Sequence, residues 1–287
     1  MHQTLLYILL IFAFSSCSSA KNTEKQTHTA VFEEADSLRV VEVFSRFSEQ
    51  KSYPIDSFAH EFINTPYAAH TLETGQDENL VINLHEFDCT TFVETCMALQ
   101  QTISTSNFTF DTYARQLKNI RYRNGELSDY TSRLHYFTEW IANNIEQGFV
   151  EDVTQKYGGI PYQKEINFMS THPDAYRQLK ADTALVKSIV EAEEHLSNQT
   201  FYFIPKNEIA SIENEIEGGL IVAFTTSIDG LDVVHNGITT KKEGKTHLIH
   251  ASSDAGRVVV SENTLSEYIM QNRIQSGIIL VKPLEIK

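Results

Sequence analysis

The hydrophobic pattern of the sequence changes at Glu217–Gly219, and this change limits the folds open to the chain. Before it, apolar residues recur mostly at three- and four-residue steps, the spacing of amphipathic helices. After it come short runs rich in β-branched residues, separated by turn residues: Leu220–Phe224, Leu231–His235, His247–Ala251, Val258–Val260 and Gly277–Val281. Helices followed by neighbouring strands predict an α+β fold with an antiparallel sheet.

The helices expected before this change lie within 36–63 (with a break near Pro54), 88–102, 111–144 (including one over 132–141) and 176–192. A short strand-like run, Leu80–Leu84, lies between the first two. Near the C-terminus, Thr264 and Glu267 form a capping-box pattern that predicts a short helix over 265–271. No repeat or low-complexity linker divides the sequence, so we expect a single domain over 36–287.

The N-terminus has the features of a targeting segment. Leu5–Phe14 is an apolar run too short to span a bilayer as a helix, but typical of a signal-peptide core. It is followed by Ser15-Ser16-Cys17, which resembles the lipobox of bacterial lipoproteins. We therefore expect a lipoprotein signal peptide over 1–17, lipid attachment at Cys17 and a flexible tether over 18–35. The protein would then be exported, either facing the periplasm or anchored in the outer membrane. The alternative is an apolar helix of the mature fold.

The charge of the chain argues against a nucleic-acid partner. The net charge is −15, and no run of lysine and arginine occurs. A DNA or RNA backbone is bound through clustered cations that displace its counterions. The acidity is instead typical of a protein kept soluble by its charge.

The cysteines Cys17, Cys89 and Cys96 require separate explanations, because an odd number argues against a disulfide framework. Cys89 and Cys96 are seven positions apart on one predicted helix. The rise between them would be about 10.5 Å, which is beyond the reach of a disulfide. Cys96 falls on the apolar side of this helix, as expected of a buried structural cysteine.

Cys89 has a position suited to a reactive thiol. Asp88 is a good N-cap residue, so the cysteine would lie in the first helical turn. The free N–H groups and the dipole at a helix N-terminus stabilise an anion such as a thiolate. We therefore expect the pKa of the Cys89 thiol to fall below its usual value of about 8.5.

A nucleophilic cysteine needs a base, and the base needs a group that orients it. His235 ends a strand-like run just before Asn236-Gly237, and His250 lies in the next such run. Two adjacent strands would bring these imidazoles within hydrogen-bond range, one acting on the thiol and the other on its neighbour.

The sequence resembles the NlpC-type, papain-like superfamily of cell-wall peptidases and amidases in four stretches: Pro66-Tyr67, Asp88-Cys89-Thr90, Val234–Ile238 and Leu248–Ser252. The resemblance implies a papain-like core in which the nucleophile helix packs on an antiparallel sheet. It also implies that Cys89 is the nucleophile and His235 the base, that His250 orients the base, and that Tyr67 contributes to the oxyanion pocket. No metal and no cofactor are implied.

Two stretches, Asp88–Glu94 and Ser132–Phe137, are similar to an amidase-like branch exported by Gram-negative bacteria. This similarity implies a muropeptide substrate, cut between N-acetylmuramic acid and L-alanine. The chain departs from the superfamily at Thr90-Thr91, where Ser-Gly is common, and at Asn236, where valine is frequent. About 145 residues separate Cys89 from His235, so we expect a largely helical insertion at about 105–215 that walls the cleft.

Other functions remain open at this stage. An endopeptidase cutting within the stem peptide would use the same residues, and a non-catalytic wall-binding lipoprotein would use none of them. His60-Glu61 and His85-Glu86 begin like a zinc-binding HExxH motif, but Asn64 and Cys89 occupy the second histidine positions. A serine hydrolase is a weaker alternative, because the sequence lacks the G-x-S-x-G motif of that class.

Five further polar residues could contact a substrate. Arg133 and His135 fall on a predicted helix, and Ser170-Thr171-His172 lies in a loop-like stretch. Surface salt bridging or helix capping is the preferred interpretation for each.

Overall fold

The computed structural model describes residues 30–47, 49, 52–75 and 77–285. The predicted signal peptide, the lipid-attachment residue Cys17 and most of the predicted tether lie outside the described residues. In the described part of the chain, no helix is long and apolar enough to cross a membrane.

An antiparallel sheet forms the centre of the fold, as the sequence predicts. Its strands run in the order β4-β5-β10-β6-β7-β8-β9, and β3 pairs beside β5 on β10. The strands are β3 (Val150–Asp152), β4 (Ile160–Tyr162), β5 (Phe201–Pro205), β6 (Ile221–Thr226), β7 (Val233–Lys242), β8 (Lys245–Ser252), β9 (Arg257–Val260) and β10 (Gln275–Pro283). A second, two-stranded parallel sheet pairs β1 (Ala30–Val31) with β2 (Leu80–Val81). Each β-rich run predicted after Gly219 corresponds to a strand of the main sheet.

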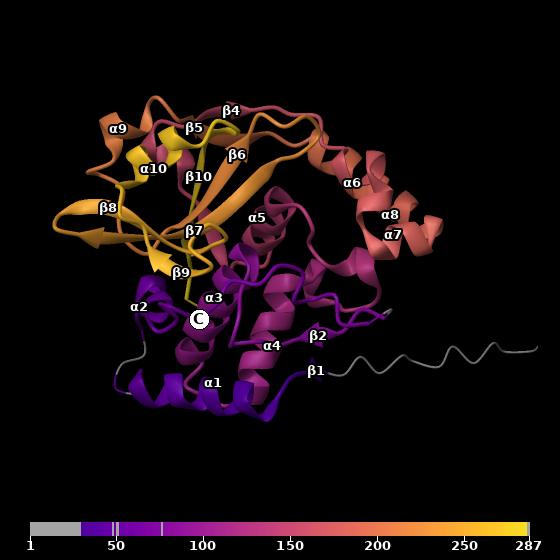
Figure 1. Cartoon of the computed structure of the whole chain (residues 1–287), viewed down its shortest axis with the longest axis horizontal. Helices are drawn as coiled ribbons and strands as arrows, with labels where there is room; N and C mark the ends of the chain where they lie inside the picture. Colours follow the sequence, from indigo (N-terminus) through magenta and orange to yellow (C-terminus); the bar gives the residue numbers. More distant parts are fainter. Residues whose placement is uncertain (1–29, 48, 50–51, 76, 286–287) are drawn as a thin grey trace, which may run out of the picture.

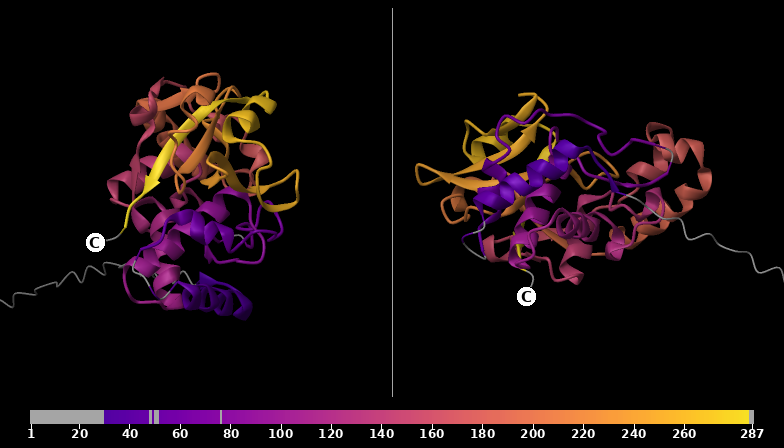
Figure 2. Two further views of the ribbon diagram at one scale, coloured as in Figure 1. Left: turned by 90° about the vertical axis from the view of Figure 1, so that its left-hand side faces the viewer. Right: turned by 90° about the horizontal axis from the view of Figure 1, so that it is seen from below.

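Ten α-helices accompany the sheets in the described residues. They are α1 (Glu34–Arg46), α2 (Ile55–His60), α3 (Cys89–Ser104), α4 (Phe110–Arg121), α5 (Phe137–Glu146), α6 (Phe168–Thr171), α7 (Arg177–Ala181), α8 (Thr183–Ser197), α9 (Ile209–Ile212) and α10 (Leu265–Gln271). Figure 1 shows α1–α4 together below the sheet, α9 and α10 above it, and α6–α8 at one end. The left view of Figure 2 shows the same separation of the N-terminal helices from the later strands.

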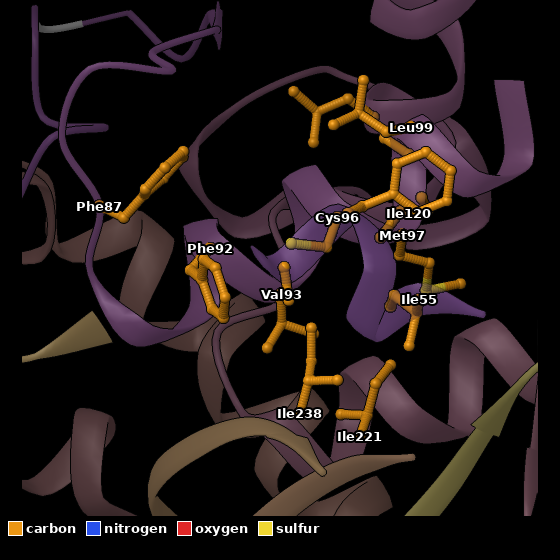
Figure 3. Close-up of a cluster of buried hydrophobic side chains, with 14 of the residues drawn as sticks. Ile55, Phe87, Phe92, Val93, Cys96, Met97, Leu99, Ile120, Ile221 and Ile238 are labelled. Carbon is orange, nitrogen blue, oxygen red and sulfur yellow. The ribbon is translucent and has the colours of Figure 1, made fainter. Parts of the chain in front are cut away.

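Alternation along the strands explains why both faces of the sheet are covered. Successive side chains of a strand point to opposite faces. Ile221 and Ala223 of β6 therefore join the apolar cluster under α3, whereas Val222 and Phe224 join the cluster under α9 and α10. In Figure 3, Val93 of α3 lies among buried side chains that include Ile221 and Ile238 of the sheet. This contact fixes α3 across the sheet.

The segment between about 105 and 215 is largely helical, as expected, but it also contains strands. It supplies α4–α9, but also β3, β4 and β5, which extend the edge of the main sheet beyond β10. The aromatic run Phe201–Pro205 pairs with both β4 and β10. The insertion is thus part of the same sheet.

Two local predictions are wrong. The helix expected over 132–141 begins only at Phe137, since Tyr136 is its extended N-cap residue and Arg133 forms a bridge with Tyr122. The strand-like run expected to end at His235 instead continues to Lys242 as β7, and His235 lies near its start.

Gly237 is required because β8 approaches it closely. A Cβ at this position would lie 2.8 Å from the carbonyl oxygen of Ile249 and 3.0 Å from the Cβ of His250. Side chains in a pleated strand seldom come so near, so glycine here marks a close backbone approach rather than a turn.

We predict that Gly237→Ala lowers the free energy of unfolding by about 1–3 kcal/mol, because the added methyl group overpacks the contact between β7 and β8. Chemical denaturation measures this change. Gly75→Ala is the control, since its added Cβ would meet no atom closer than 3.9 Å and should change stability little. Equal stability of the two variants would contradict this explanation of Gly237.

Candidate active site

Cys89 is the first residue of α3, and a capping box fixes the helix start. The backbone N–H of Thr91 donates to Asp88 Oδ1 at 2.8 Å, and the N–H of Asp88 donates to Thr91 Oγ1 at 3.0 Å. These reciprocal bonds satisfy two N–H groups at the helix start. The predicted helix start is therefore confirmed.

Cys89 and His235 line one small cavity of about 180 Å³. Its wall also includes Thr90, Asn236 and residues at the start of α5. Among the described residues, no hydrogen bond joins the Cys89 sulfur to either imidazole; the sulfur contacts Thr90 Oγ1 at 4.0 Å. The cavity leaves room beside the sulfur for a reacting group.

The two predicted histidines meet on adjacent strands. His235 Nε2 and His250 Nδ1 are 2.7 Å apart, and the rings lie edge to face with centroids at 4.9 Å. Tyr268 of α10 packs on both rings, and Phe224 stacks on His235 at 5.7 Å. The sequence analysis did not identify Tyr268 as a site residue, because the helix predicted over 265–271 did not indicate which strand residues it would cover.

Burial keeps both imidazoles neutral. Burial, together with the smaller effect of the neighbouring His250, lowers the pKa of His235 to about 3. It lowers the pKa of His250 to about 4, against the opposing charge of Asp254. At neutral pH each imidazole carries one N–H, and a single hydrogen lies between His235 Nε2 and His250 Nδ1. If His235 donates in this bond, its Nδ1 keeps a lone pair.

The prediction that the Cys89 thiol has a lowered pKa is wrong. Burial, followed by the negative charge of Asp88, raises the pKa of the thiol to about 12. The backbone N–H of Asn236 and the hydroxyl of Thr90 act in the opposite direction. Desolvation of the sulfur thus outweighs the helix N-terminus. The resting site contains a neutral thiol and neutral imidazoles.

Tyr67 lies in the segment before α3, where its backbone pairs with Phe87, and it is not among the residues that line the cavity of Cys89. Burial raises the pKa of Tyr67, and negative charge placed on Cys89 or Asp88 raises it further. Its backbone N–H donates to the carbonyl of Gly256 at 2.9 Å, which ties this segment to the turn before β9. Within the described structure, its hydroxyl makes no hydrogen bond, so it is available as a donor.

A second cavity of about 430 Å³ adjoins the first and shares Thr90, Leu134, His135 and Tyr176 with it. Arg133 lines this second cavity but is only 7% exposed, so the surface interpretation is wrong for this residue. It pairs with Glu73 at 2.7 Å, and its guanidinium lies 5.0 Å from the ring centroid of Tyr130.

His135 and His172 differ in environment. His135 lines both cavities and its Nε2 donates to the carbonyl of Tyr130 at 2.7 Å, while burial lowers its pKa to about 3. His172 is exposed and directly follows α6, and its Nδ1 lies 2.9 Å from the carbonyl of Phe168, the first residue of that helix. The capping interpretation therefore fits His172 and not His135.

The remaining candidates lie away from this site. Cys96 is fully buried, and both it and Cys89 are free thiols. His85 lies 3.7 Å from Asp36, and His60 lies 3.5 Å from the hydroxyl of Thr240. Within the described ranges, no three histidine, cysteine or carboxylate side chains come together closely enough to hold a metal ion.

Comparison with known families gives one match over most of the chain. The profile of a family described as AmiA-like, N-acetylmuramoyl-L-alanine amidase-like, matches residues 57–278. A search of curated proteins finds no match.

Solved structures share the fold. An N-acetylmuramoyl-L-alanine amidase from Bacteroides uniformis is 37% identical, with a TM-score of 0.76, covering 81% of this chain and 98% of that one. A protein from Bacteroides fragilis, described as a candidate xylanase, is 39% identical, with a TM-score of 0.73 and coverage of 79% and 99%. Protein LPG0564 from Legionella pneumophila is 19% identical, with a TM-score of 0.64 over 88% and 95% of the chains, and indicates the fold alone.

We predict slow alkylation of Cys89 by iodoacetamide at neutral pH. With the thiol pKa at about 12, the rate should be on the order of a hundredfold below that of free cysteine at pH 7. It should rise about tenfold per pH unit through pH 10. Peptide mapping of the labelled sulfur measures the rate, and Cys89→Ser gives the background. A rate that levels off near neutral pH would show that the thiol pKa is low.

Proposed function

The chain belongs to the N-acetylmuramoyl-L-alanine amidase-like family, and from this membership we propose that it is a cysteine amidase of peptidoglycan fragments. The bond cut is the amide between N-acetylmuramic acid and L-alanine. Cys89 is the nucleophile, His235 the base and His250 the residue that orients the base. The protein would act in cell-wall turnover or recycling.

The observation that carries the proposal is the shared cavity of Cys89 and His235, with His250 bonded behind the base. A nucleophile, a base and an orienting group are the elements of acyl transfer. The apolar surroundings make a lone thiolate or a lone imidazolium costly, but the two charges attract each other when they form together. The thiol therefore gives its proton to His235 as the sulfur attacks.

The reaction then follows the usual two steps of a cysteine hydrolase. The sulfur attacks the lactyl carbonyl, and the Tyr67 hydroxyl stabilises the oxygen that gains negative charge. His235 returns its proton to the departing amine of L-alanine, which leaves a thioester on Cys89. A water molecule, deprotonated by His235, hydrolyses the thioester and releases the muramoyl acid.

The Bacteroides fragilis relative is described as a candidate xylanase, and a xylanase is a glycosidase. The residues that line the Cys89 cavity argue against glycosidase activity in this chain. Glycosidases of most families need two carboxylates on either side of the bond. Asp232 is the carboxylate among the residues that line the Cys89 cavity. It is buried and accepts hydrogen bonds from the backbone and hydroxyl of Thr138, at 2.7 and 2.8 Å.

We expect Cys89→Ala to lower the turnover of a muropeptide by at least about a thousandfold, since the nucleophile is lost. Cys96→Ala on the same helix should keep activity, because Cys96 is buried in the core. Mass spectrometry of the wild-type products should show a free peptide that begins with L-alanine. Residual wild-type activity in Cys89→Ala would contradict the mechanism, and cleavage within the stem peptide would favour an endopeptidase.

We also propose that Cys17 carries a lipid that anchors the exported protein to a membrane facing the periplasm. The apolar run and lipobox-like residues before this cysteine support the proposal. Cys17→Ser should release the protein from the membrane fraction and abolish labelling by a fatty-acid analogue. Unchanged membrane association and labelling would contradict lipidation at this residue.

A further inference from the structure

We propose that Thr90 and Asn236 are positioning residues that act in series to stabilise the thiolate of Cys89. Each follows a reactive residue in the sequence, Thr90 after Cys89 and Asn236 after His235. The proposal deepens the cysteine mechanism proposed above and rests on it for its role in catalysis.

The contact between the two residues joins α3 to β7 beside the sulfur. Asn236 Nδ2 donates to Thr90 Oγ1 at 3.0 Å, and Thr90 Oγ1 lies 4.0 Å from Cys89 Sγ. Both residues line the same cavity as Cys89 and His235.

The directions of the bonds follow from the donors available. An amide nitrogen can only donate, so the Thr90 oxygen accepts from Asn236. The single hydroxyl hydrogen of Thr90 then remains for the sulfur. The backbone N–H of Asn236 also acts on the sulfur, so two donors converge on it. A full negative charge on the sulfur would shorten both contacts.

The burial of Asn236 indicates that packing alone does not account for it. Asn236 is 2% exposed, and its Oδ1 is buried without a hydrogen-bond partner in the described structure. Such an atom loses its hydrogen bonds to water without replacement, a cost that an apolar side chain of similar size would avoid. A polar residue at this position therefore requires another reason, and its donor to Thr90 supplies one.

The titratable groups around the sulfur keep their charge in the pH range in which the reactivity of the Cys89 thiol is measured. Tyr67 and Tyr268 have raised pKa values, that of Tyr268 reaching about 12, and His235 and His250 titrate at about 3 and 4. None of these changes charge between about pH 6 and 9. Asp88 is the carboxylate that acts directly on the sulfur and opposes its ionisation.

The test compares rates of alkylation of Cys89 by iodoacetamide at pH 8, which require no turnover. Thr90→Val should lower the rate about threefold or more, the effect of raising a thiol pKa by one unit after the gain in nucleophilicity is allowed for. Thr90→Ser should restore the rate to within twofold of wild type. Thr95→Val, on the same helix but away from the sulfur, is the control for loss of a buried hydroxyl.

A double-mutant cycle tests whether the two residues act in series. Asn236→Val should also slow alkylation, but it should have no further effect when Thr90 is already valine. Wild-type rates in Thr90→Val, or independent and additive effects of the two substitutions, would overturn the proposal. If the alkylation results hold but no amidase activity is found, the proposed function fails and the role in thiolate stabilisation stands.

Discussion

The packing of α3 across the central sheet is the constraint on which the site depends. Val93 contacts the sheet through Ile221 and Ile238 in a cluster that excludes water. This contact holds the first turn of α3 against β7, so that Cys89 and His235 share one cavity although they are far apart in the sequence. The capping box at Asp88 then fixes which residue begins the helix.

The same burial that brings the reactive groups together also suppresses their charges. Cys89 has a raised pKa and both imidazoles have lowered ones, so the resting site is neutral. On the proposed mechanism, the thiolate and imidazolium form only together, as the substrate is attacked. The donors near the sulfur, from Thr90 and the backbone of Asn236, compensate part of the cost of desolvation.

Local signals in the sequence were sufficient for the parts of the fold that depend on neighbouring residues. The N-cap residue at Asp88, the capping box at Thr264 and the β-rich runs after Gly219 all correspond to observed elements. The strand-like run was expected to end at His235, but β7 continues through Asn236-Gly237, where β8 approaches the glycine closely, and only the tertiary structure shows this approach. The prediction of a lowered thiol pKa failed for the same reason. The position of Cys89 at the helix start can be recognised from neighbouring residues, whereas the desolvation of its sulfur depends on all the segments around the cavity. Tyr268 and the burial of Arg133 likewise depend on contacts between distant segments.

The central claim is that the Cys89 sulfur becomes covalently acylated during hydrolysis. Rapid acid quenching of the full-length protein with a defined muropeptide, followed by peptide mapping, tests this most directly. The account predicts a transient muramoyl adduct on the peptide that contains Cys89, formed before the free acid appears. Product formation without any adduct on that peptide, or an adduct on another residue, would contradict it.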